Sequence, residues 1–221
     1  MSTFEYNIPI ASVIDAYKKG LFPMAETFSS NEIYWIEPKN RGVFFFDQIK
    51  IPKSFKKFLK TKVFDISVDS RFIEVIDSCA KITNTRRDTW INDTIKKLYI
   101  ELHYKGYAHS IECYYNKKLV GGLYGIELGG IFFGESMFSF VSNASKVALV
   151  HLFERLKLGG FSVLDTQFIN AHLKQFGAIE LPNKKFKSII EKNINKKADF
   201  FNISPEGVLP NSLYPLKNKI I

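Results

Sequence analysis

The sequence predicts an α+β fold in which a mixed sheet carries helices on its faces. The first observation is the order of hydrophobic patterns after residue 108, which run strand, strand, strand, helix, strand, helix. Strands joined by tight turns pair antiparallel, whereas a strand–helix–strand crossover makes a parallel pair. The second observation is a short, aromatic-rich segment over residues 1–49. We expect it to form a small N-terminal domain beside a larger domain over residues 50–221.

The elements of the N-terminal half are short and separated by turn residues. We expect, in chain order, a helix over residues 8–19 that stops at Gly20, strand-like runs over 33–38 and 42–46, a helix over 50–62, a helix over 71–80, and a helix that begins at Asn92 or Asp93 and continues through His103.

In the C-terminal half, turn residues and glycines separate the predicted elements more clearly. We expect strands over residues 109–115 and 118–127 joined by a turn at Asn116-Lys117, a strand after Gly129-Gly130 that ends at Glu135, a helix capped by Ser142 or Asn143 and ended by Gly159-Gly160, a strand over 161–168, and a short helix over 169–176. The Lys/Asn-rich tail after about residue 183 is expected to be peripheral.

The bulk composition narrows the classes of function. Lys and Arg number 31 against 22 Asp and Glu, so the net charge is +9, which favours a polyanionic partner unless it reflects a lysine-rich proteome. The two cysteines, Cys79 and Cys113, form no CxxC motif, so we expect neither a metal site nor a disulfide. No signal peptide and no apolar run of about 18 residues is present, which favours a cytoplasmic protein without membrane contact.

The helix over residues 50–62 is cationic on one side. Its apolar residues recur at helical spacing, and Lys53, Lys56, Lys57 and Lys60 share the opposite face. This face is either a solvated surface or a surface that contacts the phosphates of a nucleic acid.

Three polar residues lie at predicted strand ends. Asp165 and Gln167 alternate in a strand and should therefore point the same way, roughly 6.5–7 Å apart, and Glu135 follows another buried strand. The pair either bonds to loop backbone or holds a polar reacting group such as an amine. Separated carboxylates in a cationic protein suggest an amine-bearing polyanion, as when an aminoacyl-tRNA meets a peptide. No G-x-S-x-G, G-x-G-x-x-G or Walker loop indicates a serine hydrolase or a nucleotide site.

An ordered set of motifs resembles the leucyl/phenylalanyl-tRNA–protein transferase family. The motifs extend from about residue 15 to about residue 190, and they are AYKKGLFP, WIEPKNR, DTWI, GYAHSIE, LVGGLYG, FGESMFS, NASKVAL and LDTQFIN. The resemblance implies a small N-terminal domain and a C-terminal domain of acetyltransferase-like (GNAT) architecture. It also implies transfer of Leu, Phe or, less well, Met from aminoacyl-tRNA to proteins that begin with Lys or Arg. Neither a metal nor acetyl-CoA is implied, and we expect a monomer.

The resemblance also implies roles for individual residues. Asp165 and Gln167 match the pair that engages the α-amino group of the acceptor. The positions expected near the aminoacyl group and the 3′-terminal adenosine are Glu135, Trp90, Trp35, Ile36 and Asn170. The lysine face is the expected track for the tRNA backbone.

Departures from the family pattern leave alternatives open. The usual W-W-S-P run is Tyr34-Trp35-Ile36-Glu37-Pro38 here, and a glycine-rich segment expected before AYKKG is missing. The donor amino acid is therefore open. The alternatives are transfer to a different amine, such as a cell-wall peptide, and a tRNA-binding protein without catalysis.

Overall fold

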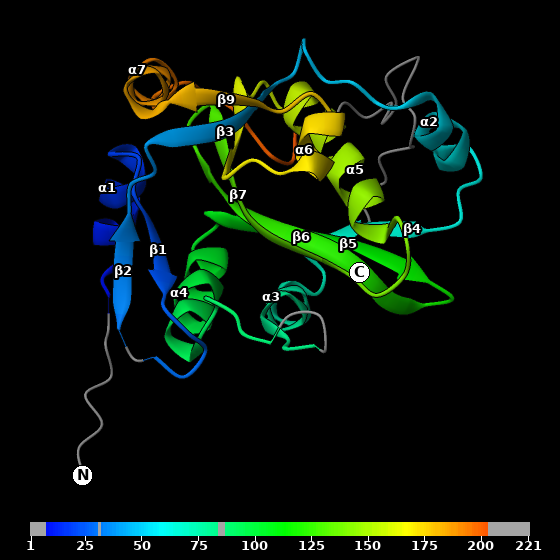
Figure 1. Cartoon of the computed structure of the whole chain (residues 1–221), viewed down its shortest axis with the longest axis horizontal. Helices are drawn as coiled ribbons and strands as arrows, with labels where there is room; N and C mark the ends of the chain where they lie inside the picture. The colour runs from blue at the N-terminus through cyan, green and yellow to red at the C-terminus, as the bar shows by residue number, and fades with distance from the viewer. Residues whose placement is uncertain (1–7, 31, 84–86, 203–221) are drawn as a thin grey trace.

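The computed structural model describes residues 8–30, 32–83 and 87–202, which form one large and one small sheet (Figure 1). The large sheet has the strand order β4-β5-β6-β7-β8-β3-β9. In chain order its strands are β3 (Asn40–Phe45), β4 (Asp65–Val68), β5 (Ala108–Tyr115), β6 (Lys118–Leu128), β7 (Ile131–Ser139), β8 (Val163–Gln167) and β9 (Ile179–Pro182). The small sheet is a ribbon of β1 (Phe22–Ala25) and β2 (Ile33–Ile36).

Helices cover both faces of the large sheet, as the sequence predicts (Figure 1). One face carries α2 (Lys53–Leu59), α5 (Ala144–Leu158) and α6 (Ala171–Gln175). The other face carries α1 (Ile10–Lys18), α3 (Phe72–Ala80), α4 (Asp93–Tyr104) and α7 (Asn183–Asn193). Within the described residues, none of these helices has the length and apolar character that crossing a bilayer requires.

The pairing of the strands confirms a mixed sheet. Strands β7 and β8 are parallel, from Ile131 opposite Val163 to Phe133 opposite Asp165, and α5 is the crossover between them. The other neighbours in the sheet are antiparallel. The parallel pairing stops at Asp165, and this is the place where the candidate site lies.

Strand β3 lies between β8 and β9, although it precedes them by more than a hundred residues. Val43 is opposite both Asp165 and Ile179 in the two antiparallel pairs. Part of the segment expected to form the N-terminal domain is therefore a strand of the large sheet. The division of the chain into residues 1–49 and 50–221 stays a prediction.

The expected end of β7 at Glu135 is wrong. The strand continues to Ser139, so Glu135 lies in its middle. The reason is that β7 keeps pairing with β6, as far as Gly121 opposite Ser139, after its pairing with β8 has stopped. The carboxylate is therefore held by strand geometry on both sides rather than by a loop.

The expectation of a peripheral tail is wrong for its first part. Helix α7 buries Phe186 and Ile190, and Phe200 is also buried. Phe186 and Ile190 are four residues apart and therefore share one face of the helix, although lysines and asparagines surround them in the sequence. Residues 203–221 of the expected tail lie outside the described residues.

Two glycines with positive φ provide a matched test of the turn between β6 and β7. Gly129 has φ +58, and a methyl group added there would overlap the carbonyl oxygen of Ile194; Gly106 has φ +77, and an added methyl group would meet nothing within 4 Å. We expect Gly106→Ala to cost about 1 kcal/mol of unfolding free energy through backbone strain alone. Gly129→Ala should cost at least about 1–3 kcal/mol more, because backbone must move. Urea unfolding measures both values, and equal losses would contradict the expectation.

Candidate active site

A cavity of about 250 Å³ lies where β7 and β8 stop pairing. Most of its lining is apolar and comes from β6, β7, β8, α5 and α6, namely Leu123, Met137, Leu149, Leu152, Leu164 and Leu173. Its polar lining includes Glu135, Ser136, Thr166 and Asn170. An apolar pocket with a few polar groups is typical of a site for a small ligand with a hydrophobic part. This cavity suits an apolar side chain attached to a polar group.

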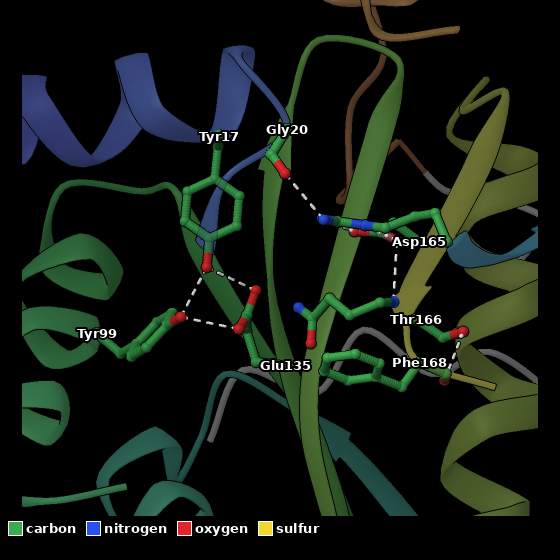
Figure 2. A network of polar contacts seen from close by, with 9 residues as sticks. Tyr17, Gly20, Tyr99, Glu135, Asp165, Thr166 and Phe168 are labelled. Atoms are coloured by element: carbon green, nitrogen blue, oxygen red, sulfur yellow. Dashed lines mark hydrogen bonds and ion pairs between the residues drawn. The ribbon is translucent and has the colours of Figure 1, made fainter. Parts of the chain in front are cut away.

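Glu135 is a buried carboxylate that is held by two tyrosines. Tyr17 donates a hydrogen bond to its Oε1 over 2.7 Å, and Tyr99 donates to its Oε2 over 2.8 Å. The two hydroxyls are 2.6 Å apart, so the three side chains form a closed network (Figure 2). Tyr17 comes from α1 and Tyr99 from α4, so two helices of one face fix a residue of the sheet.

The charge of Glu135 is poorly compensated. Burial raises its pKa from 4.5 to about 7, and the charge of Asp165 adds to this effect, whereas the hydrogen bonds from the tyrosines and the nearby side chain of Gln167 oppose it. Among the described residues, no Lys or Arg forms a salt bridge with Glu135. A buried carboxylate beside a cavity and without a cationic partner can accept a cationic ligand group such as an ammonium.

Asp165 is fully buried and is paired with Arg41. The guanidinium donates from Nε to Oδ1 over 2.8 Å and from Nη2 to Oδ2 over 2.7 Å. This bidentate pair joins β3 to β8 inside the sheet. Asp165 is not among the residues that line the cavity. The direct contact with an amine that the resemblance implies for Asp165 stays a prediction, and its burial favours an indirect role.

Gln167 has an unusual backbone conformation at the end of β8. Its φ is +58, which is uncommon for a residue with a side chain. Its backbone N–H donates to Oδ1 of Asp165 over 2.9 Å. The register of β3 against β8 shifts between Gly42 and Val43, so β8 contains an extra residue at this point. Bulges of this kind redirect side chains and are common beside active sites.

The side chain of Gln167 is buried but not fully bonded. Its Nε2 has no hydrogen-bond partner among the described residues. The side-chain amide of Gln167 nevertheless helps to lower the pKa of Glu135. The two side chains therefore belong to the same site. Gln167, like Asp165, is not among the residues that line the cavity, but its neighbours Thr166 and Phe168 are. A buried amide with an unused donor at this edge is suited to binding a ligand.

The remaining predicted residues divide into two groups. Asn170 lines the cavity, and its Oδ1 caps α6 by accepting from the amide of Leu173 over 2.9 Å. Trp35 and Ile36 lie on β2, and the carbonyl of Trp90 accepts from the amide of Ala25 at the end of β1. Neither tryptophan nor Ile36 lines the cavity, so these three belong to the ribbon side of the molecule.

The substitution at Glu37 has a structural partner. Its carboxylate is 2.5 Å from Nζ of Lys187 and accepts from Nδ2 of Asn183 over 2.6 Å, so both contacts are with α7. These contacts lower the pKa of Glu37. Glu37 therefore connects the end of β2 to α7, and it is not among the residues that line the cavity.

The cationic helix is amphipathic, as predicted. Phe55 and Leu59 are buried, and the predicted cationic residues are exposed, namely Lys53, Lys56, Lys57 and Lys60. The structure thus confirms the two faces of α2. Contact with a nucleic acid stays a prediction.

Sequence reasoning missed three residues of the site, namely Tyr17, Tyr99 and Arg41. Tyr17 and Tyr99 occupy apolar positions of amphipathic helices, where a hydroxyl needs a buried partner. Arg41 is the first residue of the buried run of β3, where a charge likewise needs a partner. These signals indicate buried polar networks, but they do not identify the partners.

Comparisons with known proteins agree with the geometry. The family model described as leucyl/phenylalanyl-tRNA protein transferase matches residues 43–191, and the model of its N-terminal domain matches residues 7–39. A leucyl/phenylalanyl-tRNA–protein transferase of Rhodopseudomonas palustris is 46% identical over 88% of this chain and 84% of its own length. Another from Nitrobacter winogradskyi is also 46% identical, over 90% of this chain and 85% of its own.

A solved structure supports the fold. The crystal structure of FemX aligns with a TM-score of 0.50 over 81% of this chain and 70% of its own, at 11% identity. At this identity the likeness concerns the fold alone. It confirms the expected acetyltransferase-like architecture of the mixed sheet.

The raised pKa of Glu135 predicts how stability depends on pH. The folded protein binds this proton more tightly than the unfolded chain, so the contribution of Glu135 to stability falls as the pH rises from about 4.5 to about 7. Glu135→Gln removes this contribution. The free energy of unfolding of the variant, relative to the wild type, should therefore increase between pH 5 and pH 8 by up to roughly 3 kcal/mol.

Urea unfolding of both proteins at the two pH values measures this difference. Glu191→Gln, at an exposed position of α7, controls for the general effect of removing a charge. A difference between Glu135→Gln and the wild type that does not change with pH would contradict the assignment.

Proposed function

This chain belongs to the leucyl/phenylalanyl-tRNA protein transferase family, and from that premise we propose that it transfers Leu or Phe, and less well Met, from aminoacyl-tRNA to proteins that begin with Lys or Arg. The product would carry a new N-terminal residue that marks it for degradation by the N-end rule. The observation that supports this proposal best is the apolar cavity with Glu135 in its wall. We place the reaction in the cytoplasm, in a monomer that needs no cofactor.

The cavity is proposed to hold the aminoacyl group of the donor. Its leucine-rich lining accepts an unbranched or γ-branched side chain by burying it from water. Glu135 would accept the α-ammonium group of the donor, because it is a buried carboxylate without a cationic partner among the described residues. Glu37 forms its ion pair with Lys187 of α7. The residues that line the cavity, rather than Glu37, would therefore select the donor amino acid.

Gln167 is proposed to orient the acceptor amine. The amine nitrogen attacks the carbonyl carbon of the aminoacyl ester, a C–N bond forms, and the C–O bond to the ribose breaks. The amine loses one proton, and the ribose oxygen gains one. Because the ester is already activated, the protein needs mainly to position the amine and to exclude water.

The tRNA is proposed to extend from the cavity across the surface. Trp90 would stack near the 3′-terminal adenosine, with Trp35, Ile36 and Asn170 close to the aminoacyl end. The exposed lysines of α2 would contact backbone phosphates without reading the sequence.

A transfer assay tests the proposed function. Purified protein is mixed with labelled Leu-, Phe-, Met- or Arg-tRNA and with peptides that begin with Lys, Arg, Asp or Ala. We expect transfer of Leu and Phe to the Lys and Arg peptides. Gln167→Ala should reduce transfer by about 10²-fold or more, because it removes the group that orients the amine.

The other outcomes are equally informative. Transfer of a different amino acid, or to an acidic N-terminus, would keep the reaction and change the specificity. Binding of tRNA without transfer to any peptide would overturn the proposal and favour a protein that only binds tRNA.

The salt dependence of tRNA binding tests the role of α2. If Lys56 and Lys57 each neutralise a phosphate, Lys56→Gln/Lys57→Gln should reduce the slope of log affinity against log salt by about 2. Lys184→Gln/Lys185→Gln, an exposed pair on α7, is the matched control and should leave the slope unchanged. Filter binding between 50 and 200 mM salt measures both slopes, and equal slopes for the two double variants would exclude this track.

A further inference from the structure

Arg41 makes more contacts than an ion pair requires. It is fully buried on β3, and besides its two bonds to Asp165 it donates from Nη1 to the carbonyl of Gly20 over 2.9 Å. Its guanidinium carbon lies 4.9 Å from the ring centre of Phe22 and 4.6 Å from that of Phe186. The guanidinium is thus fixed both by its hydrogen bonds and by the aromatic rings beside it.

The fixed guanidinium determines the orientation of the Asp165 carboxylate. Both carboxylate oxygens accept from Arg41, and Oδ1 also accepts from the backbone N–H of Gln167. The bond to Gln167 holds that residue in a backbone conformation that side chains disfavour. A chain of contacts therefore runs from Arg41 through Asp165 to Gln167.

The contact with Gly20 connects this chain to the other half of the site. Gly20 is three residues after Tyr17, and its amide donates to the carbonyl of Tyr17 over 2.9 Å. Tyr17 in turn donates to Glu135. Arg41 thus contacts both the segment that holds Glu135 and the strand that ends in Gln167.

We propose that Arg41 is a positioning residue for the transfer step. Through Asp165 and Gly20, Arg41 fixes the side-chain amide of Gln167 relative to Glu135. Arg41 touches neither donor nor acceptor and acts through these neighbours. This inference rests on the proposed function, because it concerns the step in which the acceptor amine attacks the ester.

Arg41→Lys is the direct test, because lysine keeps the charge and loses the planar fork. We expect the single-turnover rate of transfer to fall about 10²-fold, since small displacements of orienting groups have effects of this size. The Kd for aminoacyl-tRNA should stay within about threefold of wild type. Arg155→Lys is the matched control, because Arg155 is also fully buried but contacts the carbonyl of Phe200, and it should transfer at the wild-type rate.

A double-mutant cycle separates positioning from a general loss of structure. If Arg41 acts through Gln167, Arg41→Lys should cause little further loss of rate in a Gln167→Ala background. If Arg41 only supports the fold, the two losses should multiply. If Arg41→Lys does not fold, Asp165→Asn breaks the same pair from the other side. Asp165→Asn should then likewise cause little further loss of transfer rate in the Gln167→Ala background.

The outcomes distinguish this inference from the proposed function. A wild-type protein that does not transfer overturns the proposed function and the inference with it. A wild type that transfers, together with a folded Arg41→Lys variant at full rate or with losses that multiply, overturns the inference alone.

Discussion

The buried pair of Arg41 and Asp165 is the interaction on which the site depends. Charges in a protein interior are tolerated when they are paired and fully bonded, and removing one partner of such a pair costs about 3–5 kcal/mol. Here the pair is shielded completely, and it connects β3, β8 and the turn at Gly20. The same contacts that neutralise the two charges therefore place the end of β8.

Glu135 is the opposite case, a buried carboxylate held by neutral hydroxyls. Tyr17 and Tyr99 orient it without cancelling its charge, and burial raises its pKa to about 7. A cationic ligand would supply the missing compensation, and a protonated amine has the right charge. The site thus combines one carboxylate whose charge is neutralised by an arginine and one that is held by neutral hydroxyls.

The sequence predicted what depends on local pattern and missed what depends on distant pairing. The strands β5 and β6 and the helix α5 were predictable, because alternation, helical spacing and glycine punctuation are local signals. The position of β3 in the large sheet was not, because its partners follow far along the chain. Asp165 and Gln167 were identified as a polar pair, but Arg41, 124 residues away from Asp165, leaves no local sign of its partner. The sequence also singles out Glu135, but it predicts a strand end there, whereas β7 continues to Ser139.

The place of β3 has a consequence for the synthesis of the protein. A ribosome makes β3 more than a hundred residues before it makes β8 and β9, the strands on either side of β3. At elongation rates of about 5–20 residues per second, Arg41 waits roughly 6–25 s for Asp165 to be made. Contacts of such long sequence separation also slow folding. A nascent chain therefore cannot complete the site before β8 and β9 have left the ribosome, however early β3 is made.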